Sequence, residues 1–121
     1  MATQGLVWEC SAADWQWVLG VNLWGVIHGH RAFLPHLVEH GDGHIVNTAS
    51  MLSFFGGGLV PGYSASKGGV AQLTKSLAIA YADDGIRVNA VAPGWIATPL
   101  TQALQDDPAR AAPILARTPM K

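Results

Sequence analysis

Two short apolar runs on either side of one long helical segment constrain the fold of this chain more than any other feature. Residues 44–49 and 86–91 are mostly apolar and partly β-branched, and a glycine precedes each run, which is typical of buried strands. Between them, residues 63–82 carry apolar side chains three and four positions apart, which predicts a helix. Two strands joined through a helix run parallel, with a right-handed crossover. The sequence therefore predicts an α/β fold built on one βαβ unit.

Further helices are expected before this unit. Ser11 and Asp14 have the spacing of a helix cap, in which a side-chain oxygen and an acid satisfy the first turn. The apolar periodicity that follows predicts helices over about residues 12–40, with a break near Gly20. Pro35 removes a backbone donor inside this span, and we expect a kink there.

The remaining segments are expected to be irregular. Residues 50–62 contain four glycines and a proline, which is typical of a flexible loop that lines a site. Prolines divide the last part of the chain, so short helices are expected over about residues 99–117. A chain of 121 residues is long enough for one domain, and we treat residues 1–121 as a single unit.

The balance of charged and apolar residues narrows the class of protein. Only 12% of the residues are charged and the formal net charge is -1, so the chain is neither disordered nor equipped with a basic stripe for nucleic acid. So few charged residues cannot cover the whole surface, and we expect a partner to cover part of it. Cys10 is the single cysteine, and no apolar run approaches the ~18 residues that span a bilayer. We expect a cytoplasmic protein without a membrane partner.

Four polar residues are expected to meet at one edge of the sheet. Tyr63 and Lys67 lie one helical turn apart on one face, and an ammonium close to a phenol favours the phenolate. This spacing alone also arises by chance on exposed helices. Ser50 lies thirteen residues before Tyr63 at the carboxyl end of the first strand, where open α/β sheets bind ligands. Asn22 lies in the preceding helix, so all four can converge.

These residues lie in motifs that resemble the short-chain dehydrogenase/reductase family over about residues 11–120. The motifs are Val-Asn-Leu-Trp-Gly, Ile-Val-Asn-Thr-Ala-Ser, Tyr-Ser-Ala-Ser-Lys-Gly, Ile-Arg-Val-Asn-Ala-Val-Ala-Pro-Gly and Trp-Ile-Ala-Thr-Pro. The resemblance implies an NAD- or NADP-dependent oxidoreductase that interconverts a small secondary alcohol and a ketone. It also implies a homodimer or tetramer, in which the helices that carry Asn22 and Tyr63 pack against their copies.

The resemblance implies a role for each matched residue. Tyr63 would be the general acid/base, Lys67 would hold the nicotinamide ribose and tune Tyr63, and Ser50 would bond the substrate oxygen. Asn22 matches a residue that holds a relay water. The segment along the nicotinamide is matched by Pro93, Gly94, Ile96 and Thr98, so that the implied cofactor contacts are Tyr63, Lys67, Pro93, Gly94, Ile96 and Thr98.

The sequence departs from this family in what it lacks. Members begin with a strand, a Gly-rich turn and a helix that bind the dinucleotide phosphates, and no G-x-G-x-x-G turn occurs here. At roughly 30 residues for each βαβ unit, the chain cannot hold a six-stranded sheet. We therefore expect residues 1–121 to be one incomplete catalytic domain with a partial doubly wound, Rossmann-like parallel sheet. Cofactor binding by this chain alone is expected to be weak or absent.

The residues leave two other functions open. His36, Glu39 and His40 match H-x-x-E-H, the inverted motif of zinc peptidases, but Gly41 ends the helix at once and Pro35 disturbs it, so we expect no metal. A second alternative is a non-catalytic oligomerisation fragment of a dehydrogenase.

We also make predictions for the residues around the expected site. Asn47 and Asn89 are expected to satisfy backbone groups rather than to touch substrate. The pocket wall is expected to be largely apolar, and it would be made by Met51, Leu52, Phe54, Phe55, Leu59, Trp95 and Leu100.

Overall fold

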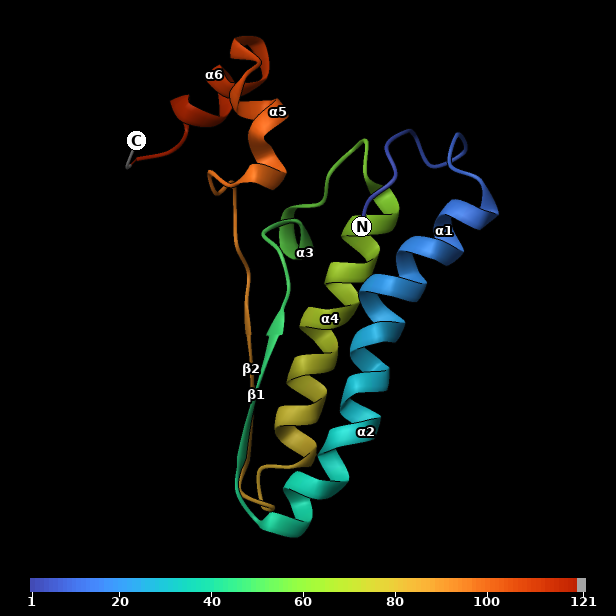
Figure 1. Ribbon diagram of the computed structural model, residues 1–121, viewed down its shortest axis with the longest axis vertical. Helices are drawn as coiled ribbons and strands as arrows, with labels where there is room; N and C mark the ends of the chain where they lie inside the picture. Colours follow the sequence, from blue (N-terminus) through green and yellow to red (C-terminus); the bar gives the residue numbers. More distant parts are fainter. Residues whose placement is uncertain (120–121) are drawn as a thin grey trace.

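A two-stranded parallel sheet and the helices on one of its faces form the body of the chain (Figure 1). The computed structural model describes residues 1–119. Strand β1 (Gly43–Thr48) pairs with β2 (Ile86–Val91) in register from Gly43 opposite Ile86 to Thr48 opposite Val91. The parallel βαβ unit is thus confirmed. β2 has the expected bounds, whereas β1 begins and ends one residue earlier than expected.

The helical segment before β1 has three parts. Helix α1 (Ala12–Leu19) is capped by Ser11, whose hydroxyl accepts from Asp14 N–H, and α2 (Gly25–His40) leads into β1. The predicted break near Gly20 takes the form of a π-helical turn over Gly20–Trp24. Pro35 lies inside α2, which continues as one α-helix to His40, and the kink expected at Pro35 stays a prediction.

Two helices lie between the strands. The segment expected to be an irregular loop contains a short helix, α3 (Leu52–Phe55), so that expectation was wrong in part. The helix that follows, α4 (Pro61–Ala80), begins two residues earlier than predicted because proline is favourable in a first turn, where no helical N–H partner is needed. In Figure 1, α2 and α4 run side by side and antiparallel to the strands.

The chain after β2 forms the predicted short helices. A 3₁₀ turn (Pro99–Thr101) leads into α5 (Gln102–Gln105), and α6 (Pro108–Ala116) begins where the Asp107 side chain accepts from Ala109 N–H and Arg110 N–H. Figure 1 places these helices beyond the carboxyl ends of both strands.

One buried apolar cluster lies toward the amino ends of the strands, and Val18, Ala49 and Val70 are buried outside it. Leu34 of α2 packs with Ile86 and Val88 of β2, and these are buried. Gly85 makes the chain enter β2 at φ +76°, and a Cβ there would lie 2.5 Å from the Gly41 carbonyl oxygen, so only glycine fits. The partly buried residues around this cluster are Leu37, Val38, Ile45, Leu77, Ala78 and Tyr81.

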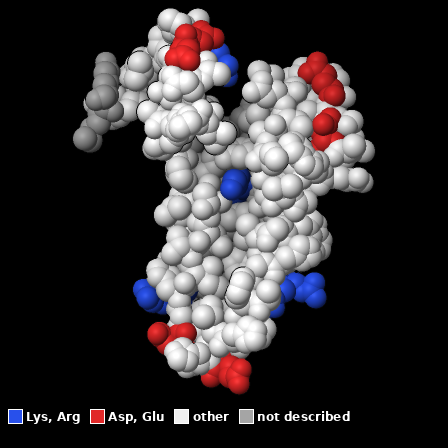
Figure 2. All heavy atoms as spheres, in the orientation of Figure 1, with Lys and Arg blue, Asp and Glu red and all other residues white. Residues whose placement is uncertain are grey.

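Much apolar surface stays exposed. Phe33, Val46 and Ile79 are more than half exposed, and on the face drawn in Figure 2 the charged side chains gather mainly toward the two ends of the molecule. Burial of apolar side chains is the main driving force of folding, so exposed apolar area of this extent favours contact with further polypeptide. Within residues 1–119, no helix is long and apolar enough to cross a membrane.

Candidate functional site

Tyr63 and Lys67 lie together beside the carboxyl end of β1. The ammonium of Lys67 is 5.9 Å from the centre of the Tyr63 ring, and it donates a hydrogen bond to the Thr48 carbonyl oxygen (2.7 Å). Partial burial lowers the pKa of Lys67 from its ordinary value, because removal from water disfavours the charged form. The two side chains predicted from their spacing are therefore neighbours at the expected edge of the sheet.

Ser50 is tied to the same helix through Ser53. The Ser53 hydroxyl donates to the Lys67 carbonyl oxygen (2.7 Å) and accepts from Ser50 N–H (3.1 Å). The Ser50 hydroxyl accepts from Leu52 N–H (3.2 Å), which leaves its own hydrogen available for another acceptor. Ser50 is buried, and α3 holds it in place at the end of β1.

Asn22 is joined to α4 by a serine that the sequence analysis did not single out. Its side-chain amide donates to the Ser66 hydroxyl (3.2 Å), which in turn donates to the Tyr63 carbonyl oxygen (2.7 Å). Ser66 is completely buried. A hint was available in the sequence, since Ser66 is three residues after Tyr63 and therefore near it on the helix surface. Asn22 also bonds both backbone groups of Met1, accepting from its nitrogen (3.2 Å) and donating to its oxygen (2.7 Å).

The segment after β2 divides into two parts. The Pro93 carbonyl oxygen accepts from Met51 N–H (3.0 Å), and Gly94 lies against the Met51 side chain, so both are near Ser50. Ile96 and Thr98 instead form hydrogen bonds with Thr101, and the Thr98 carbonyl oxygen also accepts from the Gln105 side chain. The structure thus brings Pro93 and Gly94 to the strand ends, and it records no bond that joins Ile96 or Thr98 to Tyr63 or Lys67.

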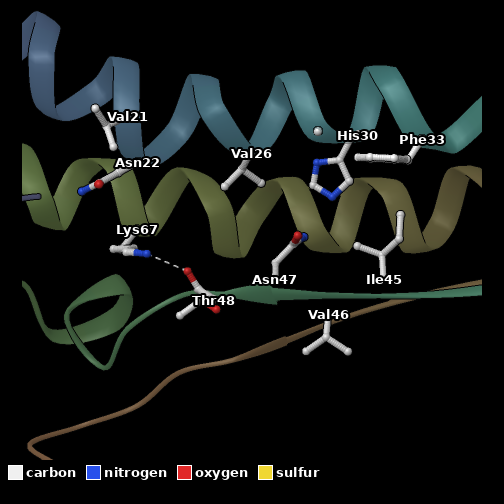
Figure 3. Close-up of a pocket in the computed structure, with 11 residues that line it drawn as sticks. Val21, Asn22, Val26, His30, Phe33, Ile45, Val46, Asn47, Thr48 and Lys67 are labelled. Atoms are coloured by element: carbon white, nitrogen blue, oxygen red, sulfur yellow. Dashed lines mark hydrogen bonds between the residues drawn. The ribbon is translucent and has the colours of Figure 1, made fainter. Parts of the chain in front are cut away.

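A groove of about 430 Å³ runs between α2 and β1, and it reaches the same end of the sheet (Figure 3). Asn22 and Lys67 close the end near the site, and His30 points into its middle. The whole lining consists of Val21, Asn22, Val26, Gly29, His30, Phe33, Ile45, Val46, Asn47, Thr48 and Lys67.

The two asparagines on the strands bond side chains rather than backbone groups, contrary to expectation. The Asn47 amide donates to the Thr74 hydroxyl of α4 (2.9 Å), which fixes the sheet to the helix. The Asn89 amide pairs with the His44 ring (3.0 Å) on the uncovered face. Both partners come from a neighbouring element, which periodicity in one segment cannot identify.

The zinc alternative gains no support from geometry. The H-x-x-E-H residues lie in the last turns of α2, and within residues 1–119 no group of three or more histidine, cysteine or acidic side chains is placed to hold a metal ion. Zinc sites in proteins use three or four such ligands.

Comparison with known proteins connects the chain to one family. A family model described as short chain dehydrogenase matches residues 1–109. The chain is 49% identical over 106 residues to a 2-dehydro-3-deoxy-D-gluconate 5-dehydrogenase of Bacillus subtilis, matching 88% of this chain and 42% of that protein. It is also 49% identical to a 2-(R)-hydroxypropyl-CoM dehydrogenase of Xanthobacter autotrophicus, over 86% of this chain and 42% of the other.

A solved structure extends this likeness to the fold. The gluconate 5-dehydrogenase of Burkholderia cenocepacia, in complex with NADP and tartrate, superposes with a TM-score of 0.93 and 34% identity. The match covers 98% of this chain and 47% of that one. The chain therefore spans about half the length of the relatives that it matches.

Proposed function

Because this chain belongs to the short-chain dehydrogenase family, we propose that the protein carrying it is an NAD(P)-dependent oxidoreductase that interconverts a secondary alcohol and a ketone. The relatives named above are dehydrogenases of hydroxylated substrates, which supports this reaction class. One observation carries the proposal: a tyrosine and a lysine with a lowered pKa are neighbours at the carboxyl end of parallel strands. Ligands bind at that edge in open α/β folds.

Tyr63 is the proton-transferring group in this proposal. In the oxidation direction its phenolate takes the hydroxyl proton of the alcohol, and in the reduction direction its phenol returns that proton to the carbonyl oxygen. The ammonium of Lys67 lies 5.9 Å from the centre of the Tyr63 ring, so a positive charge lies beside the proton-transferring residue. A nicotinamide cofactor, when bound, accepts or supplies the hydride.

Ser50 and Asn22 position the other groups. The Ser50 hydroxyl already accepts from Leu52 N–H, so its hydrogen can be donated to the substrate oxygen. Asn22 supports Tyr63 through Ser66 and closes one end of the groove next to Lys67, where a relay water has polar partners. Their hydrogen bonds hold both side chains in fixed positions, and proton transfer requires groups to be positioned in this way.

The residues present fit one half of the cofactor. Lys67 offers an ammonium and Tyr63 a hydroxyl to the ribose, and the segment with Pro93, Gly94, Ile96 and Thr98 would lie along the nicotinamide. Lys67 is only partly buried, and its ammonium reaches the strand end from one side. No glycine-rich turn for the pyrophosphate occurs in residues 1–119, so the adenine half finds no site in this part of the chain.

The chain alone should bind nicotinamide cofactors weakly or not at all. Its contacts would have to offset the whole cost of immobilising a large ligand while reaching only half of it. Titration of the purified chain with NADH and NADPH by calorimetry tests this, and we expect a dissociation constant above about 10 μM. Tighter binding would contradict the proposal that this chain contacts only the nicotinamide half of the cofactor.

Assembly and cellular location form a second part of the proposal. We place the enzyme in the cytoplasm as a homodimer or tetramer, with residues 1–121 as the catalytic part of one domain. α4 carries Ile79 with 81% of its surface exposed, and Trp24 of the π-helical turn is half-exposed, which supports packing of these helices against a second copy. Light scattering of the chain at micromolar concentration tests this, and a clean monomer would refute it.

Turnover by the protein that carries this chain tests the activity. Gluconate and cyclohexanol, as a sugar acid and a plain secondary alcohol, are offered with NAD⁺ and NADP⁺, and reduced nicotinamide is followed by its absorbance. We expect oxidation of at least one secondary alcohol. Absence of turnover with every alcohol and ketone would favour the oligomerisation fragment, whereas peptide hydrolysis lost on zinc chelation would favour the peptidase.

A further inference from the structure

The backbone of Ser50 is fixed by Ser53, a serine that the proposed reaction does not use. The N–H groups on either side of Ser50 donate to carbonyl oxygens of the chain at and after β2 (2.8 and 3.0 Å), in the alternation of a parallel strand. Ser50 N–H lies between them and donates instead to the Ser53 hydroxyl (3.1 Å). Ser53 N–H donates back to the Ser50 carbonyl oxygen (2.9 Å). Both backbone groups of Ser50 are therefore bonded to one residue.

The Ser53 hydroxyl also reaches α4. It donates to the Lys67 carbonyl oxygen (2.7 Å), so its single hydrogen and one of its lone pairs are both engaged. The Lys67 ammonium donates to the Thr48 carbonyl oxygen (2.7 Å), two residues before Ser50. Lys67 is thus connected to the end of β1 at two points, through its side chain and through Ser53. These residues form a closed ring that joins the strand end to the helix carrying Tyr63.

The hydroxyl of Ser50 depends on the same short helix. It accepts from Leu52 N–H (3.2 Å), so all three hydrogen bonds that Ser50 makes within residues 1–119 end on α3. A helix of four residues has too few bonds to be stable alone, and no side chain caps the start of α3. Its position therefore depends on contacts with α4, where the Ser53 carbonyl oxygen would lie 3.7 Å from a Cβ added at Gly68. The Ser53 hydroxyl supplies a hydrogen bond to this contact.

We propose that Ser53 is a positioning residue, which sets where the Ser50 hydroxyl lies relative to Lys67. This role rests on the proposed function, in which Ser50 donates to the substrate oxygen. Ser53 acts only through its neighbours, because both bonds of its hydroxyl are to backbone groups. The role requires a group that donates and accepts at once, which a hydroxyl does and a methyl group cannot. Loss of that hydroxyl would leave Ser50 N–H without its partner.

Ser53→Ala in the complete enzyme tests this role. It should lower kcat about tenfold, because a small displacement of a hydroxyl that contacts the reacting oxygen slows the reaction strongly. KM for the cofactor should stay unchanged, since Tyr63 and Lys67 are retained. Ser53→Thr keeps a hydroxyl at the same position and should restore most of the rate. Ser76→Ala is the matched control, because it removes an exposed hydroxyl whose bond lies within α4.

A double-mutant cycle with Ser50→Ala shows whether Ser53 acts through Ser50. In the Ser50→Ala background, Ser53→Ala should change kcat by less than about twofold, because the hydroxyl to be positioned is already absent. A purely structural serine would lower the thermal midpoint in both backgrounds and would not change kcat at temperatures where each variant is folded. An effect on kcat that persists at full size without the Ser50 hydroxyl would overturn the proposal, and so would a wild-type kcat in Ser53→Ala.

Hydrogen exchange separates the role of Ser53 from the reaction class. In the complete protein, the Ser50 amide should exchange at least about tenfold faster in Ser53→Ala than in the wild type, and Ser53→Thr should restore slow exchange. This measurement needs no substrate, so absence of turnover would reject the proposed reaction while exchange still decides whether Ser53 holds Ser50. An unchanged exchange rate in Ser53→Ala would overturn the proposal whatever the enzyme turns over.

Discussion

The two ends of the parallel strands differ in what their side chains do. At the amino ends, Leu34, Ile86 and Val88 form the buried cluster, and Gly85 approaches the Gly41 carbonyl oxygen closely. At the carboxyl ends, the Ser53 hydroxyl joins the backbones of Ser50 and Lys67, and the Ser66 hydroxyl joins the Asn22 amide to the Tyr63 carbonyl oxygen. The amino ends therefore carry a cluster of buried apolar side chains, whereas the carboxyl ends carry oriented polar groups beside buried apolar ones such as Val18 and Ala49.

This difference separates stability from chemistry along the same helices. The segment from the π-helical turn through α2 and the helix α4 both pass the two ends, so each contributes partly or fully buried apolar residues at one end and site residues at the other. A substitution in the apolar end should change the free energy of unfolding, and a substitution of a reacting group should change the rate. Substitutions at each end of the strands test whether this separation holds.

Tyr63→Phe should have the largest effect on the reaction. In the complete enzyme it should lower kcat by about 10²–10⁴, because the proton-transferring hydroxyl is lost. Its free energy of unfolding should stay nearly unchanged, since the Tyr63 hydroxyl makes no hydrogen bond to another group within residues 1–119. Tyr81→Phe, at the end of α4, is the matched control and should retain activity. Retention of more than about a tenth of the rate by Tyr63→Phe would remove it from the catalytic role.

Leu34→Ala should have the largest effect on stability. Leu34 is 5% exposed in the apolar cluster, and its truncation leaves a cavity, so the free energy of unfolding should fall by about 2–5 kcal/mol. Urea unfolding followed by tryptophan fluorescence measures this. In the complete enzyme, KM for the alcohol should not change under conditions where the variant is folded. A change in KM whose free-energy equivalent is as large as the loss of stability would show that the two ends of the strands are energetically coupled.

Gly85→Ala should destabilise the chain by more than about 1–2 kcal/mol. Alanine disfavours the left-handed φ of +76° by roughly that amount, and its Cβ would also lie 2.5 Å from the Gly41 oxygen. Gly20→Ala is the matched control, because a Cβ there meets nothing within 4 Å and the residue has helical φ. That control should be stabilised by about 0.5–1 kcal/mol. Thermal melts of both variants show the difference, and equal effects would contradict the close approach.

The smallest predicted effect is a pH dependence at Lys67. Its pKa in the folded chain lies below the ordinary value of 10.5. At pH values where Lys67 is protonated in both the folded and the unfolded chain, its partial burial therefore lowers the free energy of unfolding. As pH rises through the folded pKa toward 10.5, the unfolded chain holds more protons and stability increases.

Urea unfolding of the wild type and of Lys67→Met, in steps from neutral to alkaline pH, measures this contribution. The stability difference between the two proteins should shift in favour of the wild type as pH rises. A shift in the opposite direction would mean that the Thr48 carbonyl, rather than partial burial, dominates at Lys67. Lys75→Met, at an exposed position of the same helix, is the matched control.

The parts of the fold that depend on one segment were predictable from the sequence. The alternation of residues 86–91 and the spacing of Tyr63 and Lys67 are local patterns, and the structure has a strand and a shared helix face there. The cap at Ser11 is equally local, because both of its partners lie within four residues.

The parts that depend on contacts between segments were not predictable. α3 lies just before three consecutive glycines, and its Ser53 hydroxyl bonds the Lys67 carbonyl oxygen fourteen residues away. Asn22 and Ser66 are 44 residues apart, and their hydrogen bond depends on how α4 packs against the π-helical turn. Side-chain bonds of this kind follow from packing, which no pattern within one segment contains.

The π-helical turn at Gly20–Trp24 determines which way the side chains of α2 face relative to those of α1. Gly25 N–H bonds the Gly20 carbonyl oxygen, so this turn holds one residue more than an α-helical turn. At about 100° per residue, the buried Val18 and Leu34 would lie about 160° apart around an uninterrupted α-helix. One extra residue removes about 100° of that rotation, so both side chains can face the interior on one nearly straight axis. Deletion of a single residue here would therefore turn the whole of α2, and with it His30 and Leu34, out of phase with the sheet.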